Sequence, residues 1–225
     1  AGEGDELRAR LEAWNDAQRK WVHLSTIFGN AATGIADRLP AAAAKFADAD
    51  RTFGKCRSAL LGKEGAKVRS ILDSPKLPGL LDGVSAALGD AQRALGDYLE
   101  MQRASFARFY FVGDDDLLSI LGGGDDSTHR VQPHLVKMFA ALARVDVQNG
   151  AMASCDGETV ALPDGCDLGE RDAIKWLGNV ERGMRQAVSA ALAEALKTWP
   201  ADDGVDAWLA ATPTQAAILA AQIKW

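Results

Sequence analysis

The sequence predicts a mainly α-helical protein with a small antiparallel β-meander. Apolar residues recur at helical spacing over most of the chain, and prolines and glycines interrupt the periodic segments. One short region instead combines β-forming runs with Asn-Gly and Asp-Gly pairs. A long helix predicted near residues 168–199 would span roughly 45 Å. We therefore expect an elongated body of helical bundles in series, in two parts, residues 1–112 and 113–225.

The first part contains three predicted helices. The first helix, residues 6–28, carries an apolar stripe with steps of three, four and seven. Trp14 and Trp21 are seven residues apart, share one face, and are expected to seat this helix on its neighbour rather than to anchor a partner. A glycine-bearing break follows, and Pro40 suits the first turn of the second helix, where its missing N–H has no partner. The third helix is predicted over residues 80–103. Large apolar residues share one face of the second helix: Phe46, Phe53 and Leu60.

The segment from Ser105 to Val112 is rich in aromatic residues. β-formers dominate it, so we predict a strand that acts as a keystone of packing. Its aromatic members are Phe106, Phe109, Tyr110 and Phe111. Asp114 is predicted to cap the next helix, residues 115–121, and its neighbouring acids also suit the positive end of that helix.

The clearest β signal lies in the second part, after a helix predicted over residues 133–142. Three short strands are expected: residues 145–148, 151–155 and 159–162. The pairs Asn149-Gly150 and Asp156-Gly157 separate them, and both pairs favour type I′ turns. These features predict a meander near residues 145–162.

The C-terminal quarter is predicted to be helical. The long helix has an apolar stripe that includes Leu177, Val180, Met184, Ala187, Val188, Ala191, Ala195 and Leu196. Pro200 ends this helix, and two shorter helices are expected near residues 203–210 and 213–224. The alanine enrichment of the region suits helices that pack closely.

The bulk properties exclude several classes of function. The net charge is −6 and the pI is near 5.1, which disfavours nucleic acid and acidic membrane surfaces as partners. No stretch approaches the ~20 apolar residues of a membrane span. The chain begins with Ala1, which is consistent with an internal fragment of a larger protein. The spacing of Cys56, Cys155 and Cys166 fits no zinc motif, and we expect reduced thiols.

The sequence offers no convincing catalytic, cofactor or metal site. The glycine cluster Gly122–Gly124 lacks the Gly-Lys-Ser/Thr ending of a phosphate loop, so it is interpreted as a helix stop. The acidic run Asp114–Asp116 lacks the ligand pattern of a calcium loop. His129 and His134 are five apart, whereas two ligands on one helix face need a spacing of three or four. We therefore predict that the chain is not itself an enzyme.

Several motifs in order resemble the linker region of dynein heavy chains, the segment that precedes the AAA+ ring. The matching stretches are LEAWNDAQRKWVHLSTIF (11–28), RLPAAAAKFADADRTF (38–53), LGDYLEMQRASFARFYFVGDDDLLSIL (95–121), RVQPHLVKMF (130–139), WLGNVERGM and TPTQAAILAAQIKW. Together they extend over nearly all of the chain. The sequence departs from the family pattern at four positions: His23 for Tyr, Phe53 for Trp, Ala107 for Pro and Gly113 for Ser.

The resemblance implies a mechanical function. In that family the linker is a bent helical rod that moves as the ring cycles through ATP, and this movement is the power stroke. ATP and Mg would then bind in the ring of the same heavy chain, and microtubules would be reached only through other parts of it. Dynein intermediate or light chains are further expected partners. The implied location is the cytoplasm and cytoskeleton. The Ala- and Gly-rich composition, typical of a GC-rich genome such as that of a flagellated alga, favours the axoneme.

The resemblance also assigns expected roles to residues. The force-transmitting candidates are Trp14, Trp21, Phe106, Phe109, Tyr110, Phe111 and Asp114. The exposed side of the long helix is a candidate ring-facing surface, and a solvated face is the simpler alternative for its basic residues: Arg171, Lys175, Arg182 and Arg185. The glycine-bearing breaks Gly29–Gly34 and Gly122–Gly124 are interpreted first as ordinary loops, and a bending point in one of them is the alternative. The rival function is a free-standing helical scaffold or adaptor.

Overall fold

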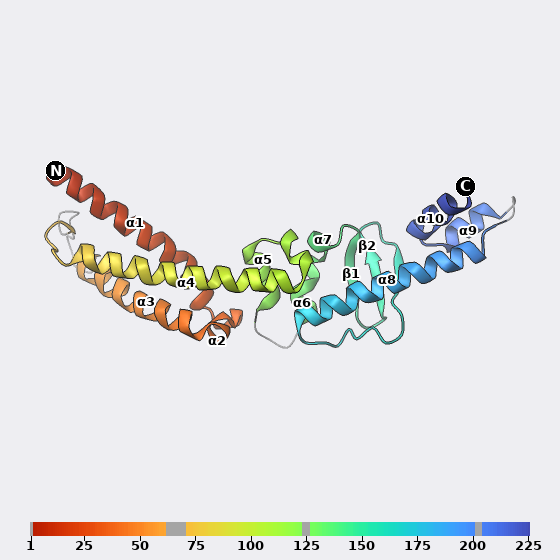
Figure 1. The fold of residues 1–225 in the computed structure, drawn as a ribbon, viewed down its shortest axis with the longest axis horizontal. Helices are drawn as coiled ribbons and strands as arrows, with labels where there is room; N and C mark the ends of the chain where they lie inside the picture. Colours follow the sequence, from red (N-terminus) through yellow and green to blue (C-terminus); the bar gives the residue numbers. More distant parts are fainter. Residues whose placement is uncertain (1, 62–70, 123–126, 201–203) are drawn as a thin grey trace. The chain divides into compact units, whose positions relative to one another are not determined.

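The computed structural model of the chain (Figure 1) is mainly helical and contains one small antiparallel sheet, as predicted. The structure describes residues 2–61, 71–122, 127–200 and 204–225. The chain forms two compact units: residues 1–104 with 122–124, and residues 105–121 with 125–225. The aromatic segment thus belongs to the second unit, whereas the sequence placed it at the end of the first part.

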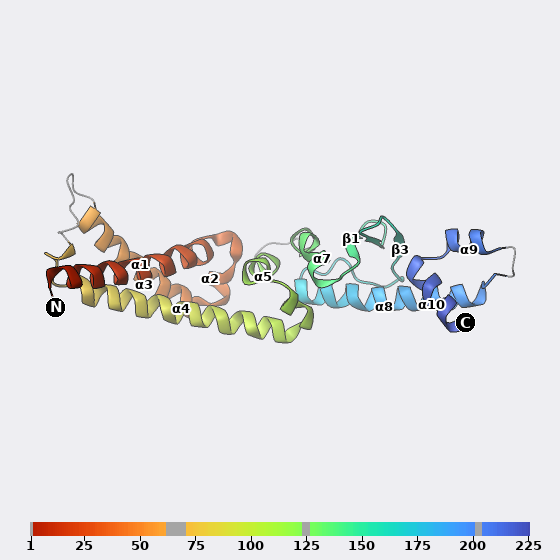
Figure 2. The same ribbon diagram turned by 90° about the horizontal axis from the view of Figure 1, so that it is seen from above.

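The first unit is built from helices. Its elements are α1 (Glu3–Phe28), the 3₁₀ turn η1 (Ala31–Thr33), α2 (Ile35–Arg38), α3 (Pro40–Leu61) and α4 (Leu77–Ser105). Figures 1 and 2 both show α1, α3 and α4 running alongside one another. As predicted, α3 begins at Pro40, and Phe46, Phe53 and Leu60 are buried. The predicted break at Gly29–Gly34 contains η1, and Gly34 has a φ of 58°, a conformation suited to glycine.

Trp14 and Trp21 pack α1 against α3. The ring centroids of Trp14 and Trp21 lie 5.1 Å and 5.8 Å from that of the buried Phe53. The indole N–H of Trp21 also donates to Asp50 Oδ1 at 2.7 Å, and the Arg57 guanidinium lies 4.8 Å from the Trp21 ring centroid. The predicted shared face of the two tryptophans is confirmed.

Polar contacts join α4 to the other helices of the first unit. Ser85 Oγ on α4 lies 3.1 Å from Asp16 Oδ2 and accepts from Lys20 Nζ at 3.0 Å, both on α1. Lys45 on α3 pairs with Asp90 on α4 at 2.8 Å. Because these contacts lie at the rim of an apolar core, they fix the register of the helices more than they add stability.

The second unit combines one long helix with several short helices and turns and a small sheet. In order, its elements are the 3₁₀ turn η3 (Ala107–Phe111), α5 (Asp114–Leu121), α6 (Ser127–Val131), the 3₁₀ turn η4 (Gln132–His134), α7 (Leu135–Met138), β1 (Leu142–Asp146), β2 (Ala151–Ser154), β3 (Thr159–Ala161), α8 (Ala173–Lys197), α9 (Val205–Ala211) and α10 (Thr214–Lys224). The helix predicted over residues 133–142 is therefore too long. Phe139 is extended, with φ −132° and ψ 110°, and leads into β1.

The β-meander is confirmed, although its turns differ from the prediction. The strand order is β1-β2-β3, and both pairs are antiparallel. A type I′ turn needs positive φ at both central residues. In the described part of the chain only glycines have positive φ, including Gly150 at 58° and Gly157 at 86°. Asp146 instead pairs with Ala151, which leaves a four-residue loop between β1 and β2.

The long helix α8 begins at Ala173 and not near residue 168 as predicted. The Asp172 carboxylate accepts hydrogen bonds from the backbone N–H groups of Ile174 and Lys175, both at 3.0 Å, and so caps the helix. The preceding carbonyl of Leu168 accepts from the buried indole of Trp176 at 3.0 Å. The segment before Ala173 is thus irregular, and the Trp176 indole links it to the helix by a hydrogen bond.

Alanines allow α10 to approach α8 closely. The buried cluster consists of Ala195, Trp208, Ala216, Ala217 and Ala220, with Ala191, Leu192 and Leu196 packed against it. The Trp199 and Trp208 rings meet edge to face with centroids 5.1 Å apart. The two predicted C-terminal helices are confirmed. Each helix end that the structure describes lies within two residues of its predicted position.

Candidate functional site

The aromatic segment is a 3₁₀ turn and not the predicted strand. Phe106 is extended, and the N–H groups of Phe109 and Val112 then donate to the carbonyls of Phe106 and Phe109 at 3.0 Å and 3.2 Å. A 3₁₀ helix has three residues per turn, so residues spaced by three share a face. Phe106, Phe109 and Val112 follow that spacing and are buried. Burial along this segment therefore follows a period of three and not the alternation expected for a strand.

The same geometry sends two aromatic side chains outward. Tyr110 and Phe111 are 60% and 67% exposed, whereas Phe109 is fully buried and contacts the Phe106 ring edge to face at 5.2 Å. Of the four aromatic residues expected to pack in the core, Phe106 and Phe109 do so, and Tyr110 and Phe111 do not. Asp114 is the first residue of α5, so it lies within the helix it was expected to precede.

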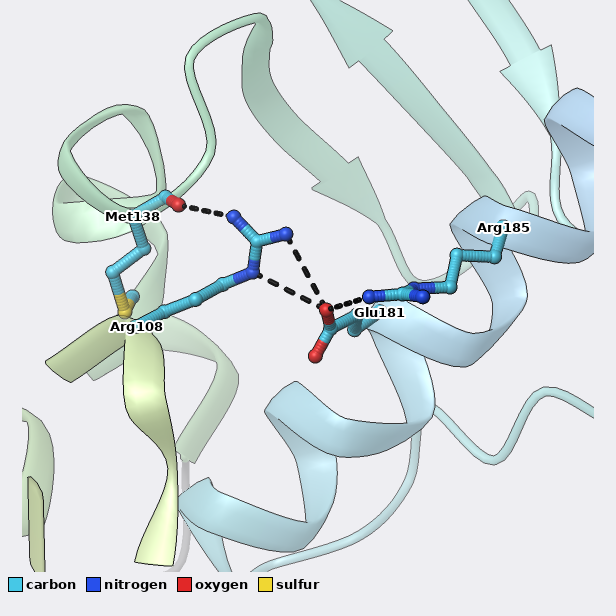
Figure 3. Close-up of polar contacts among 4 residues, drawn as sticks. All are labelled: Arg108, Met138, Glu181 and Arg185. Carbon is cyan, nitrogen blue, oxygen red and sulfur yellow. Dashed lines mark hydrogen bonds and ion pairs between the residues drawn. The ribbon is translucent and has the colours of Figure 1, made fainter. Parts of the chain in front are cut away.

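Arg108, between the buried aromatics, lies at the centre of the contacts that this segment makes (Figure 3). Its Nη1 donates to the Met138 carbonyl oxygen at 2.9 Å, as Figure 3 shows. Its guanidinium carbon also lies 4.4 Å from the centroid of the Phe139 ring. Its Nε and Nη2 lie 3.4 Å and 3.3 Å from Glu181 Oε1. We call this set the Arg108 junction: Arg108, Met138, Phe139, Glu181 and Arg185.

Glu181 connects the junction to the long helix α8. The same oxygen, Oε1, accepts from Arg185 Nη2 at 3.0 Å, one turn further along α8 (Figure 3). Burial raises the pKa of Glu181, but the hydrogen bond from Arg185 and the charge of Arg108 outweigh it, so the pKa is lowered overall. Glu181 is therefore ionised at neutral pH, between two cations.

The junction joins three elements that are distant in sequence. Arg108 belongs to η3, Met138 ends α7, and Glu181 lies in the first half of α8. The Arg108 and Glu181 side chains are 34% and 25% exposed, so the pair is partly shielded from water. A guanidinium suits such a position because its planar donors are held in fixed directions. The arrangement thus links α8 to the aromatic turn through side-chain contacts.

A second polar cluster ties α5 to α7. Lys137 Nζ pairs with Asp116 Oδ2 at 2.8 Å, and His134 Nδ1 lies 3.3 Å from Asp116 Oδ1. Among the described residues, His134 Nδ1 is buried without a hydrogen bond of acceptable angle. Burial lowers the pKa of His134 and outweighs the opposing effect of Asp116. His134 is therefore neutral at pH 7, and Lys137 is the principal cation beside Asp116.

The four basic residues predicted for the exposed side of the long helix do not all lie on that helix. Arg171 precedes α8, so it does not lie on the helix as expected. Arg182 donates to Asn179 Oδ1 at 3.3 Å, and Arg185 is bound to Glu181. Arg185 thus belongs to the Arg108 junction as well as to the exposed surface. The ring-facing role of Arg171, Lys175, Arg182 and Arg185 stays a prediction.

Arg108 and Glu181 were missed as candidates because they are 73 residues apart in sequence. Two local signals were present. Arg108 interrupts a run of aromatics whose buried members are three apart, and Glu181 lies four residues before Arg185 on one helix face. Neither signal identifies its distant partner.

The described residues offer no metal-binding group of three or more His, Cys, Asp or Glu side chains. The helices in the described ranges include none that is long and apolar enough to cross a membrane. The cysteines are free: Cys56 is buried, Cys166 is half-buried and Cys155 is exposed.

Comparison with known proteins gives the family of the chain. The family model described as dynein heavy chain, N-terminal region 2, matches residues 5–195. The cytoplasmic dynein heavy chain of Dictyostelium discoideum is 36% identical over 234 residues, which cover 98% of this chain and 5% of that protein. Dynein axonemal heavy chain 1 of Rattus norvegicus is 32% identical over 219 residues, which cover 96% and 5%.

A third relative is cytoplasmic dynein 2 heavy chain 1 of Chlamydomonas reinhardtii, which is 36% identical over 187 residues, or 81% of this chain and 4% of that protein. The chain thus spans 5% or less of the length of each of these relatives. The resemblance seen in the sequence is confirmed at the level of the family and of its N-terminal region. The chain therefore belongs to the dynein heavy chain family, within N-terminal region 2.

Proposed function

We propose that this chain is a mechanical linker segment of a dynein heavy chain. It transmits an ATP-driven conformational change of the AAA+ ring into the power stroke for microtubule-based movement. Family membership supports a place in such a heavy chain. The observation that carries the mechanical role is the Arg108 junction, because a lever must be stiff where it transmits force and bend at only a few places.

The junction provides stiffness through several contacts on one side chain. An isolated exposed ion pair contributes only about 0–1 kcal/mol and exchanges readily with water. Arg108 instead binds a backbone carbonyl, an aromatic ring and a carboxylate that a second arginine also holds. Loss of one contact leaves the others, so α8 and the aromatic turn move together.

The partners follow from the same proposal. The AAA+ ring of the same heavy chain is the principal one, with the basic residues of α8 as candidate contacts. ATP and Mg bind in that ring, and other parts of the heavy chain contact microtubules. Dynein intermediate or light chains are further proposed partners. We propose that the segment transmits movement and leaves catalysis to the ring. We propose a cytoskeletal location, and the axonemal expectation stays a prediction.

The test places Arg108→Gln in a full-length heavy chain that carries this sequence. We expect slower ATP-driven microtubule gliding with ATP hydrolysis retained, because force transmission and not nucleotide chemistry is affected. Arg93→Gln is the matched control, since Arg93 is an exposed arginine that pairs with Asp90 of its own helix, α4. Gliding at the wild-type rate in Arg108→Gln, or a parallel loss of ATP hydrolysis, would contradict the proposal.

The rival function is a free-standing helical scaffold or adaptor. The exposed pair Tyr110 and Phe111 would suit a partner surface in that case. Reading the gene beyond Trp225 distinguishes the two, because the linker proposal requires an AAA+ module with a Gly-Lys-Ser/Thr loop downstream. A reading frame without such a module would favour the scaffold.

A further inference from the structure

Asn149 differs from the other asparagines of the chain in its neighbour and its setting. The chain has four asparagines, Asn15, Asn30, Asn149 and Asn179, and glycine follows only Asn149. Asn149 is exposed in the four-residue loop between β1 and β2, and Gly150 has a φ of 58°. The space beside the Gly150 Cα, where a side chain would stand, is open. The Gly150 nitrogen therefore lacks the shielding that a side chain would give.

We propose that Asn149 is a site of spontaneous deamidation and that the reaction loosens the β1–β2 hairpin. Hydroxide removes the proton of the Gly150 backbone nitrogen, which attacks Asn149 Cγ. A new C–N bond closes a succinimide ring, and the side-chain nitrogen leaves as ammonia. Water then opens the ring at either carbonyl, which gives aspartate or isoaspartate at position 149. Solvent supplies the base and the water, and no oxidation or reduction is involved.

The structural consequence follows from the contact between Asn149 and Asp146. Asn149 Nδ2 donates to Asp146 Oδ2 at 2.9 Å, and the backbone N–H groups of Gln148 and Asn149 donate to Asp146 Oδ1, both at 3.1 Å. The side-chain hydrogen bond from Asn149 is the largest of the effects that keep the pKa of Asp146 low. Deamidation replaces this donor with a carboxylate, so two negative charges face each other in the loop.

The position of Asp146 makes the hairpin sensitive to this change. It is the last residue of β1, pairs with Ala151 of β2, and organises the loop through its carboxylate. Repulsion at Asp146 therefore acts on the end of the β1–β2 ladder. Isoaspartate adds a backbone atom to the loop, so it disturbs the register further.

Two experiments on the whole chain test the proposal. In the first, the wild-type protein is incubated at alkaline pH, digested and mapped by mass spectrometry. We expect the mass change of amide-to-acid conversion at Asn149 before it is detected at Asn15, Asn30 or Asn179. Conversion at Asn149 that is no faster than at these three sites would overturn the assignment of the site.

The second experiment compares Asn149→Asp with Gln148→Glu in urea unfolding at neutral pH. Both variants add one negative charge to the loop, but only Asn149 has a side-chain hydrogen bond to Asp146. We expect a lower urea midpoint for Asn149→Asp, a much smaller shift for Gln148→Glu, and loss of the difference when the carboxylates are protonated. Equal midpoints for the two variants would overturn the structural consequence. Should Asn149→Asp fail to fold, hydrogen exchange of the β1–β2 hairpin in deamidated wild-type protein decides instead, and exchange unchanged from the intact protein would overturn it.

Discussion

Two phenylalanines of the aromatic turn should differ sharply in their effect on stability. Phe109 is fully buried, so Phe109→Ala should cost about 3–5 kcal/mol through lost burial and the cavity left behind. Phe111 is 67% exposed, so about one third of its side chain is withdrawn from water. Full burial of a phenylalanine stabilises by about 1.5–3 kcal/mol, and Phe111→Ala should then cost about 0.5–1 kcal/mol. The two variants delete the same atoms two residues apart.

The assay is urea unfolding, combined with hydrogen exchange of α8 amides to report on the second unit specifically. Phe109→Ala should shift the unfolding midpoint strongly and accelerate exchange in α8, while Phe111→Ala should resemble the wild type. Equal losses in the two variants would refute the 3₁₀ arrangement, because residues two apart share a face in a strand but not in a 3₁₀ turn.

Three further predictions concern the second unit. Asp172→Ala should lower stability by about 1 kcal/mol in urea unfolding, because it removes the cap of α8, and an unchanged midpoint would contradict that role. A double-mutant cycle of Arg108→Gln and Glu181→Gln should give a coupling of about 0.5–1.5 kcal/mol, and additive effects would show that the pair does not interact. Because burial lowers the pKa of His134, the folded chain binds its proton less tightly than the unfolded chain. The contribution of His134 to the free energy of unfolding should therefore be fully present above the unfolded pKa, about 6.5, and decrease as the pH falls below it. His134→Gln should remove this dependence of stability on pH. A dependence that persists in the variant would contradict the assignment.

The parts of the fold that the sequence predicted correctly are governed by local patterns. The shared face of Trp14 and Trp21 follows from their spacing of seven residues, and the structure shows that both rings contact Phe53. The meander follows from turn residues between short β-forming runs. These signals depend on neighbours within a few residues, so they survive without knowledge of the tertiary structure.

The errors arose where local signals compete. Aromatic β-formers concealed the period of three at Phe106, Phe109 and Val112. The long helix was predicted to start near residue 168, although Asp172 was available as a cap. The Arg108–Glu181 contact could not be predicted because it forms only when η3 and α8 meet in the folded unit.

The most direct test of the central claim is a distance measurement within a full-length heavy chain that carries this sequence. A donor fluorophore at the exposed Cys155 and an acceptor on the AAA+ ring would report whether this segment moves during the ATP cycle. The proposed lever predicts two distances, one with ATP bound and another after release of the products, and a smaller change between them in Arg108→Gln. A constant distance through the cycle, in a motor that still drives microtubule gliding, would contradict the claim.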